Sequence, residues 1–499
     1  MNIQHNALPV AVLGAGPVGM AAAAHLIQRG FTPLILESGD TVGANLESFR
    51  HVKLFSPWRY NIDAAARSLL EAAAWQAPDP EHLPTAGEFI EHYLQPLADL
   101  PRIAACLKLR HRVNRISRQG QDKIKTAGRD SLPFLIRVHT PAGEQEFAAQ
   151  AILDASGTWS QPNPLGASGI PAIGESSLQS SIAYGMPDIL GAARSRYAGK
   201  RTLVVGAGHS AAANLIALAQ LADEEPGTTL VWAIRGKELG KLLGGGEADG
   251  LPERGRLGIR LRELRNAGRL TLVTNFRVRE LRRQNDQIEV LGEPQDGIAP
   301  SIERIDRIIA ATGSRPELQI ARELRTRVDP WIESTEALAL LIDPNLHSCG
   351  TVQPHGHREL AHPESGYYAV GAKSYGRAPN FLMATGYVQV RSVVAALAHD
   401  MAAADDVRLA LPGTGVCSTD YLGESAAGQG SGGCCGGPAA VKDPAVHEPV
   451  AETGCCGGAA PVGSSACCVL DAEQKAKGNA GCGCNTTNAE AAKAAACCG

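Results

Sequence analysis

Two glycine-rich turns, each between a predicted strand and a predicted helix, constrain this 499-residue chain more than any other feature. The first, Gly14-Ala15-Gly16-Pro17-Val18-Gly19, follows the apolar stretch 9–13 and precedes the alanine-rich stretch 20–29. Residues 33–37 have the apolar pattern of a second strand. This order predicts a βαβ unit of the kind that binds dinucleotides, with the diphosphate at the helix N-terminus.

Each glycine of the first turn has a separate physical role. In such a unit Gly14 makes the tight turn, Gly16 lets the backbone approach the diphosphate, and Gly19 lets the helix pack closely on the strand. Glu37, 18 residues after Gly19, stands where a carboxylate accepts hydrogen bonds from ribose hydroxyls. We therefore expect Gly14, Gly16, Pro17, Gly19 and Glu37 to bind the first cofactor.

The second turn, Gly206-Ala207-Gly208-His209-Ser210-Ala211, lies between a predicted strand at 202–205 and a predicted helix at 212–222. The next strand ends at Arg235 instead of an acid. A guanidinium pairs with the 2′-phosphate of NADP(H), which a carboxylate would repel, although Arg235 could also be a solvated charge. The residues expected to bind this cofactor are Gly206, Gly208, Ser210, Ala211 and Arg235.

Two dinucleotide units in one chain imply hydride transfer from a nicotinamide to a flavin. With Asp154-Ala155-Ser156-Gly157 and Ala311-Thr312-Gly313, the turns resemble the motif series of two-dinucleotide-domain flavoproteins over residues 8–400. Those proteins include flavin-containing monooxygenases and thioredoxin-reductase-like enzymes. The resemblance implies FAD in the first domain and NADP(H) in the second. It adds these cofactor-binding residues: Ser156, Gly157, Thr312, Gly313 and Gly371.

The predicted fold class is α/β, an FAD-binding Rossmann-type domain with an inserted NADP-binding Rossmann-type domain and a disordered Cys-rich C-terminal tail. The tail is expected to be disordered because the chain from Leu422 onward has no aromatic residue and is dominated by Gly, Ala and Cys. The predicted divisions are 1–168 and 331–402 for the FAD-binding domain, 169–330 for the NADP-binding domain and 403–499 for the tail.

The fate of the electrons is the open question. Thioredoxin-reductase-like enzymes need a redox cysteine pair beside the flavin, but residues 1–400 contain only Cys106 and Cys349. The segment 55–61 resembles the part of flavin-containing monooxygenases that places an asparagine near the flavin, which assigns that role to Asn61. The alternative for Asn61 is a turn residue. The region 172–178 departs from the monooxygenase pattern because it lacks the expected Phe and His.

The end of the folded part carries further candidates. Residues 366–379 resemble the strand that meets the flavin ribityl chain, followed by a predicted helix at 384–399 whose N-terminus would stabilise an anionic reduced flavin. This position makes Lys373 and Arg377 candidate catalytic residues, with surface charge as the alternative. Cys349 is a candidate for holding a thiophilic substrate, in a loop that also contains His347, His355, His357 and His362.

The C-terminal tail contains repeated cysteine pairs on a Gly-rich chain. Adjacent cysteines form only a strained disulfide, and thiolates are good ligands for soft centres such as trivalent arsenic or Hg(II). Chelation or thiol exchange is therefore expected, with incidental thiols as the alternative. The expected ligands are Cys434, Cys435, Cys455, Cys456, Cys467, Cys468, Cys482, Cys484, Cys497 and Cys498.

The core and tail together resemble flavin-dependent monooxygenase-like proteins associated with arsenic resistance. The leading hypothesis is an NADPH-dependent monooxygenase that uses O₂ to oxygenate a soft nucleophile, with a trivalent arsenical as the candidate substrate. The alternatives are a thioredoxin-reductase-like enzyme that reduces tail thiols or a bound metal, and a thiol sponge. A net charge of −4 with mixed signs argues against a nucleic-acid partner, and no apolar run reaches the length of a membrane span, so a cytoplasmic protein is expected.

Overall fold

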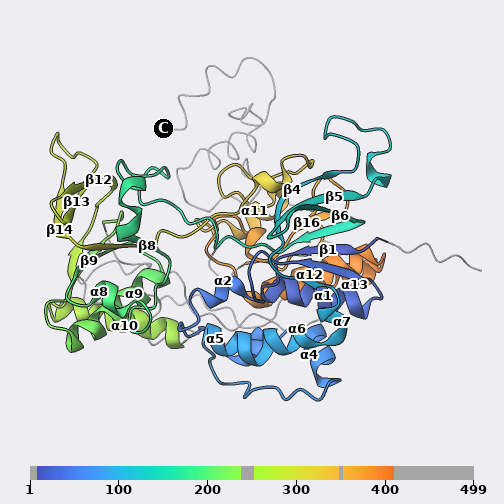
Figure 1. Ribbon diagram of the computed structural model, residues 1–499, viewed down its shortest axis with the longest axis horizontal. Coiled ribbons are helices and arrows are strands. Elements are labelled where there is room, and N and C mark those ends of the chain that lie inside the picture. The colour runs from blue at the N-terminus through green and yellow to red at the C-terminus, as the bar shows by residue number, and fades with distance from the viewer. Residues whose placement is uncertain (1–7, 238–251, 348–351, 409–499) are drawn as a thin grey trace, which may run out of the picture. The chain divides into compact units, whose positions relative to one another are not determined.

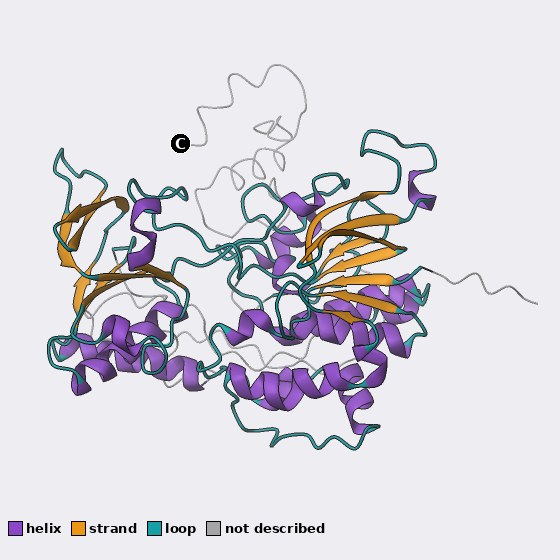
Figure 2. Cartoon of the chain, in the orientation of Figure 1, coloured by secondary structure: helices purple, strands orange, loops and turns teal. Residues whose placement is uncertain are grey.

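The computed structural model describes residues 8–237, 252–347 and 352–408, all within one unit of the chain that extends from Met1 to Glu424. Two parallel β-sheets, each accompanied by helices and by a smaller antiparallel sheet, make up this part of the chain (Figure 1). Figure 2 shows the same elements by type. The tail cysteines and Cys349 lie outside the described residues.

The first parallel sheet has the strand order β16-β7-β1-β2-β3. Along β1, Val10 and Val12 belong to the apolar core formed with the helices α1 and α12, whereas Ala11 and Leu13 belong to the core formed with β5. Alternate side chains point to opposite faces of a strand, so both faces of this sheet are covered. The elements are β1 (Val10–Leu13), β2 (Pro33–Leu36), β3 (Leu107–Lys108), β7 (Ala151–Asp154), β16 (Tyr367–Ala369), α1 (Pro17–Gln28) and α12 (Met383–Leu397).

The first sheet is assembled from two distant parts of the sequence. Strand β16 pairs in parallel with β7, so the chain returns to this sheet after the intervening unit. The antiparallel sheet on its face contains the hairpin that the alternating pattern of residues 134–147 predicts, and this hairpin turns at Gly143 with φ of 109°. The strands of that antiparallel sheet are β4 (Arg112–Arg118), β5 (Phe134–Thr140) and β6 (Gly143–Ala149).

The second parallel sheet has the order β11-β10-β9-β15-β8. Helix α9 begins at His209, within the second glycine-rich turn and three residues before the start predicted from the sequence. The antiparallel sheet β12-β13-β14 was not predicted from the sequence. The elements are β8 (Ile182–Tyr184), β9 (Arg201–Val205), α9 (His209–Glu224), β10 (Thr229–Ala233), α10 (Pro252–Asn266), β11 (Thr271–Val273), β12 (Val278–Gln284), β13 (Gln287–Gly292), β14 (Ser301–Ile305) and β15 (Arg307–Ala310).

Apolar residues at helical spacing in 85–94, with Pro96 just beyond, predict a helix that ends before the proline, but the observed helix continues past Pro96. It consists of α5 (Ala86–Phe89), the π-helix η1 (Ile90–Leu94) and α6 (Gln95–Asp99). Pro96 occupies the first turn of α6, where its missing N–H is tolerated. The other helices are α2 (Ala44–Glu47), α3 (Trp58–Asn61), α4 (Ala64–Glu71), α7 (Pro101–Ala104), η2 (Arg129–Ser131), η3 (Ser176–Ser181), α8 (Arg194–Tyr197), η6 (Gln319–Ala321), α11 (Glu336–Ile342), η7 (Gly371–Lys373) and α13 (Met401–Asp405).

The predicted α/β fold with two Rossmann-type units is confirmed for the described residues. Helix α13 crosses the predicted domain end at residue 402, and its Ala404 is fully buried. Ordered chain therefore continues beyond the residue at which the tail was predicted to begin. Within the described ranges, no helix is both long and apolar enough to span a membrane.

Candidate functional site

The first glycine-rich turn has the geometry that a dinucleotide site requires. A Cβ on Gly19 would lie 2.0 Å from the carbonyl oxygen of Gly14, so only glycine allows α1 to approach the turn this closely. A Cβ on Gly16 would have no protein atom within 4 Å. Gly16 is therefore free of packing constraints from the protein, and its open side fits a diphosphate at the N-terminus of α1.

Glu37 links the turn to the end of β2. Its carboxylate accepts hydrogen bonds from the backbone N–H of Ala15 at 2.6 Å and of Gly39 at 2.7 Å. Glu37 is 7% exposed, so these contacts hold a nearly buried carboxylate in one orientation. A carboxylate has about four lone pairs, which leaves acceptor capacity for ribose hydroxyls.

These groups line a cavity of about 410 Å³, within the usual range for ligand pockets. The N-terminal end of α12 reaches the same cavity through Phe381 and Met383. Several side chains that line this cavity were not predicted from the sequence. Some of them are aromatic, and this was the one signal in the sequence that could have identified them. Predicted residues on the wall are Gly14, Gly16, Pro17, Glu37, Ser156, Gly157 and Gly371, and the missed ones include Asn45, Phe49, Trp159, Glu317 and Phe381.

The second glycine-rich turn repeats this geometry. A Cβ on Gly206 would lie 2.1 Å from the carbonyl oxygen of Ala311, whereas a Cβ on Gly208 would have nothing within 4 Å. Ala211, in the place of the third glycine, is fully buried. The turn borders a second cavity of about 620 Å³. Its wall includes Gly206, Gly208, Ser210, Arg235, Thr312, Gly313 and Arg377.

Arg235 lies on the wall of this second cavity with its charge available. It is exposed, and within the part of the chain that the structure describes its guanidinium donates one hydrogen bond, of 3.4 Å, to the carbonyl oxygen of Ala167. No carboxylate forms an ion pair with Arg235 among the described residues. The position and the charge both fit the 2′-phosphate of NADP(H).

The same two backbone segments, 155–169 and 311–320, contribute residues to the walls of both cavities. The hydroxyl of Thr312 donates to the carbonyl oxygen of Asn163 at 2.6 Å, and the N–H of Asn163 donates to the carbonyl oxygen of Gly313 at 2.9 Å. Pro162 and Ser314 form an antiparallel bridge beside them. The crossing segments are therefore paired, which the sequence did not reveal.

Asn61 is 1% exposed at the C-terminal end of α3. Its Nδ2 donates to the carbonyl oxygen of Ser56 at 2.7 Å, and the hydroxyl of Tyr387 donates to the Asn61 carbonyl oxygen at 2.7 Å. The side-chain Oδ1 is buried without a partner among the described residues. Asn61 does not line either cavity, so its catalytic role stays a prediction.

Lys373 is 2% exposed and forms a buried ion pair with Asp154, with 2.6 Å between Nζ and Oδ2. Its ammonium also donates to the hydroxyl of Ser156 at 3.1 Å. The hydroxyl of Tyr367 donates to Asp154 at 3.0 Å, and burial followed by the Asp154 charge raises the pKa of Tyr367 well above its usual range. The pair ties the turn after β7 to η7, whereas neighbouring Arg377 is exposed on the second cavity.

The predicted histidine cluster is dispersed among separate partners. His355 and His357 are nearly buried, and His357 contacts Asp405 with 2.9 Å between Nε2 and Oδ1. Burial lowers the pKa of His362 to about 4, so it is neutral near pH 7. Across residues 8–237, 252–347 and 352–408, no group of three or more His, Cys, Asp or Glu is arranged to hold a metal ion.

Solved structures with the same fold include enzymes of two kinds. Bacillithiol disulfide reductase from Bacillus cereus is 17% identical with a TM-score of 0.57, over 79% of this chain and 100% of that one. The cadaverine monooxygenase of desferrioxamine biosynthesis from Erwinia amylovora, bound to FAD, is 13% identical with a TM-score of 0.57, over 84% and 100%. Ornithine N-hydroxylase from Kutzneria sp. 744 is 16% identical with a TM-score of 0.50, over 79% and 99%.

These likenesses show the shared fold, and no curated protein sequence matches the chain. The family described as pyridine nucleotide-disulphide oxidoreductase matches residues 11–339, a stretch that contains both glycine-rich turns. The predicted pair of cofactors, FAD and NADP(H), agrees with this family and with the fold. The chain therefore belongs to the pyridine nucleotide-disulphide oxidoreductase family.

Proposed function

We propose that this protein is an NADPH-dependent flavoprotein monooxygenase that oxygenates a soft nucleophile, with a trivalent arsenical as the first substrate to test. The observation that carries the redox part of this proposal is the pair of open glycine positions, Gly16 and Gly208, each on a separate cavity. We assign FAD to the cavity at Gly16 and NADP(H) to the cavity at Gly208. Bound FAD would supply hydride acceptance from NADPH and electron transfer to O₂.

The chain's own residues have distinct parts in this proposal. Glu37 holds the FAD ribose, and Arg235 selects NADPH by binding the 2′-phosphate of this cofactor. Arg377 contributes a positive charge to the cavity assigned to NADP(H). The unpartnered Oδ1 of Asn61 supports a role for this residue in holding a polar group that arrives with the flavin or O₂. The overall reaction consumes NADPH, H⁺, O₂ and the substrate, and yields NADP⁺, water and the oxygenated substrate.

Oxygen rather than an internal disulfide is the proposed electron acceptor because of where the cysteines lie. Cys106, the single cysteine among the described residues, precedes β3 and lines neither cavity. A soft substrate is proposed from the tail, whose repeated cysteine pairs suit thiophilic ions. The competing proposal is reduction of a disulfide or of tail thiols, which the family description and the Bacillus cereus neighbour favour.

The full-length protein loaded with FAD is expected to consume NADPH and O₂ in equal amounts when a trivalent arsenical is supplied. A pentavalent product should form in the same amount, because one oxygen atom is transferred in each cycle. The measurements are absorbance of NADPH, an oxygen electrode and arsenic speciation. If a variant with all tail cysteines changed to serine consumed NADPH and O₂ at the same rates as the parent, the chemistry would not require the tail thiols. NADPH oxidation that continues without O₂ and requires the tail thiols would establish the reductase instead.

Arg235→Ala is expected to reduce the preference for NADPH over NADH by roughly tenfold to a hundredfold. One charge-assisted hydrogen bond to the 2′-phosphate contributes about 1.5–3 kcal/mol, and NADH lacks that group. The measurement is kcat/KM for flavin reduction by each cofactor. Arg283→Ala, at an exposed position on β12, is the matched control and should leave the ratio unchanged. An unchanged ratio in Arg235→Ala would disprove its assignment to the phosphate.

A further inference from the structure

A third cavity, of about 600 Å³, opens beside η6 and shares no lining residue with the two cofactor cavities. Its wall comes from two segments that are distant in sequence, the loop between β4 and η2 and the stretch around η6. It is as large as many ligand pockets, and the proposed redox reaction does not use it. The lining residues are Lys123, Ile124, Leu318, Gln319, Ala321, Arg322, Leu324, Arg325 and Thr326.

The charge on this wall is positive. Among the described residues, no carboxylate forms an ion pair with the side chain of Lys123, Arg322 or Arg325. The ammonium of Lys123 donates to the carbonyl oxygen of Arg322 at 2.8 Å, which holds the two segments together. Three cations without acidic partners favour an anion in the space between them.

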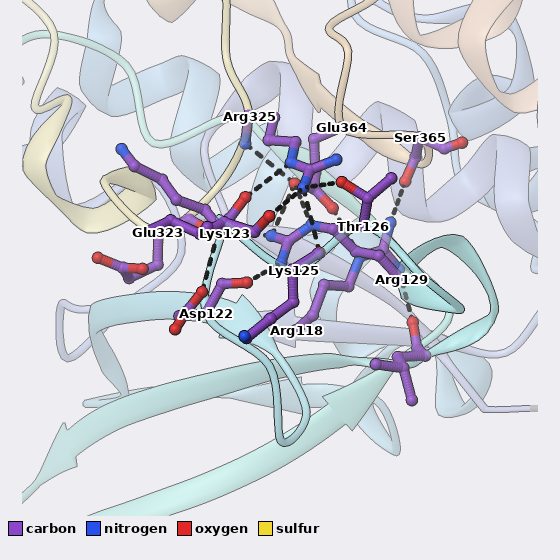
Figure 3. Close-up of polar contacts among 12 residues, drawn as sticks. Arg118, Asp122, Lys123, Lys125, Thr126, Arg129, Glu323, Arg325, Glu364 and Ser365 are labelled. Atoms are coloured by element: carbon purple, nitrogen blue, oxygen red, sulfur yellow. Dashed lines mark hydrogen bonds and ion pairs between the residues drawn. The ribbon is translucent and has the colours of Figure 1, made fainter.

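The loop is held around Arg325, as Figure 3 shows. The guanidinium of Arg325 donates to the carbonyl oxygen of Lys123 at 2.8 Å, to that of Lys125 at 3.1 Å and to the hydroxyl of Thr126 at 3.0 Å. These acceptors are neutral, so they orient the guanidinium without cancelling its charge. Hydrogen bonds therefore hold Lys123 and Arg325 on the wall of this cavity, and the exposed Arg322 adds a third cation to it.

A buried cluster beneath the wall adds to the positive potential. Arg118 and Arg129 are each 2% exposed at the side chain, and both donate to Glu364, at 2.7 Å and 2.9 Å (Figure 3). Burial opposes ionisation of Glu364, but the hydrogen bonds from Arg129 and Arg118 prevail and lower its pKa. Two guanidinium groups thus share one carboxylate, which leaves one buried positive charge unbalanced near the cavity.

One short segment, 317–320, separates this cavity from the proposed FAD cavity and contributes different residues to each. Glu317 and Ile320 line the FAD cavity, whereas Leu318 and Gln319 of the same short segment line the third cavity. The N–H of Gln319 donates to the Glu317 carboxylate at 2.7 Å, so the two sides are directly linked. A ligand that moves this segment would alter the FAD cavity as well.

We propose that the third cavity binds a phosphate-bearing small molecule and that its occupancy changes the rate at which FAD dissociates. The phosphate contacts Lys123, Arg322 and Arg325. The exposed side chain of Ile124, with Leu318 and Leu324, contacts the apolar part of the ligand. This site lies outside the proposed redox reaction and does not depend on which acceptor receives the electrons.

The test is calorimetric titration of the FAD-loaded, full-length protein with pyrophosphate, adenosine monophosphate or citrate at constant ionic strength. The titrations are repeated on the FAD-loaded Arg235→Ala variant, so that heats lost in this variant are assigned to the NADP(H) cavity and heats retained in it to the third cavity. Saturable binding of the two phosphate compounds is expected, with citrate weaker. The variant Lys123→Glu with Arg322→Glu should bind them at least roughly tenfold more weakly, since two charge-assisted contacts are removed.

The matched control is Arg279→Glu with Arg283→Glu, which changes the charge equally at two exposed positions on β12 and should bind like the parent. The FAD dissociation rate, followed by flavin fluorescence, should change roughly fivefold or more when the site is filled. Heats that do not saturate, or equal binding by both double variants, would overturn the site. Binding that leaves FAD dissociation unchanged would overturn the coupling to the FAD cavity.

Discussion

Gly16→Ala is expected to weaken FAD binding by roughly tenfold to a hundredfold while the protein still folds. The backbone of Gly16 has a φ of −77° that alanine adopts freely, and its Cβ would meet no protein atom within 4 Å. In the proposed FAD complex the diphosphate occupies that space, and forcing a methyl group into a filled site costs about 1–3 kcal/mol. The measurement is the dissociation constant of FAD by flavin fluorescence.

Two further glycine variants test the reason behind this effect. Gly19→Ala should prevent folding of the first unit, because its Cβ would lie 2.0 Å from the carbonyl oxygen of Gly14. Gly208→Ala should keep FAD and lose affinity for NADPH by a similar factor, since its open side faces the second cavity. If Gly16→Ala bound FAD normally while Gly208→Ala released it, the assignment of the two cofactors would have to be exchanged.

Lys373→Met is expected to lower the free energy of unfolding by about 3–5 kcal/mol, because it leaves the Asp154 carboxylate buried without its cation. The loss should be large because Asp154 is fully buried and cannot regain water without unfolding. On this expectation Lys373 acts as a positioning residue for Ser156, whose hydroxyl accepts from its ammonium and which lines the cavity proposed for FAD. The measurement is denaturant unfolding of the protein with and without FAD.

The double variant Lys373→Met with Asp154→Asn separates the two possible roles of Lys373. Asparagine is neutral, its Oδ1 can still accept from the Ser156 hydroxyl, and its Nδ2 can donate to the hydroxyl oxygen of Tyr367, so most of the lost stability should return. If FAD reduction and its midpoint potential return together with stability, the positioning role stands. A Lys373→Met protein that is as stable as the parent but inactive would favour the direct catalytic role predicted from the sequence.

Much of the fold could be predicted because its determinants are local. The βαβ units follow from the alternation of apolar runs, glycines and helix formers. Gly14, Gly19 and Gly206 are required by their own backbone or by a close contact within the same unit, whereas Gly16 and Gly208 leave a side of the turn open. The predicted helix at 384–399 is observed as α12 (Met383–Leu397) for the same reason. The helix at 85–94 was extended by the structure because packing tolerates Pro96 in a first helical turn.

The rest could not be predicted because it depends on residues that are far apart in the chain. Arg118 and Glu364 are 246 positions apart, and nothing local to either residue indicates that they pair. The interpretation of Lys373 changed for the same reason, since its partner Asp154 ends a different strand. The third cavity likewise needs the β4–η2 loop to lie against the segment around η6.

The sequence by itself determined two Rossmann-type units, because a glycine-rich turn encodes its own backbone geometry and its own open face. It also predicted the cofactor preference from Glu37 and Arg235. Only the tertiary structure decided which charges are paired and which are free. It buried Lys373 against Asp154 and left Arg377 exposed on the second cavity. The physical reason is that the state of a charged side chain depends on its burial and its partners, and long-range packing alone supplies both.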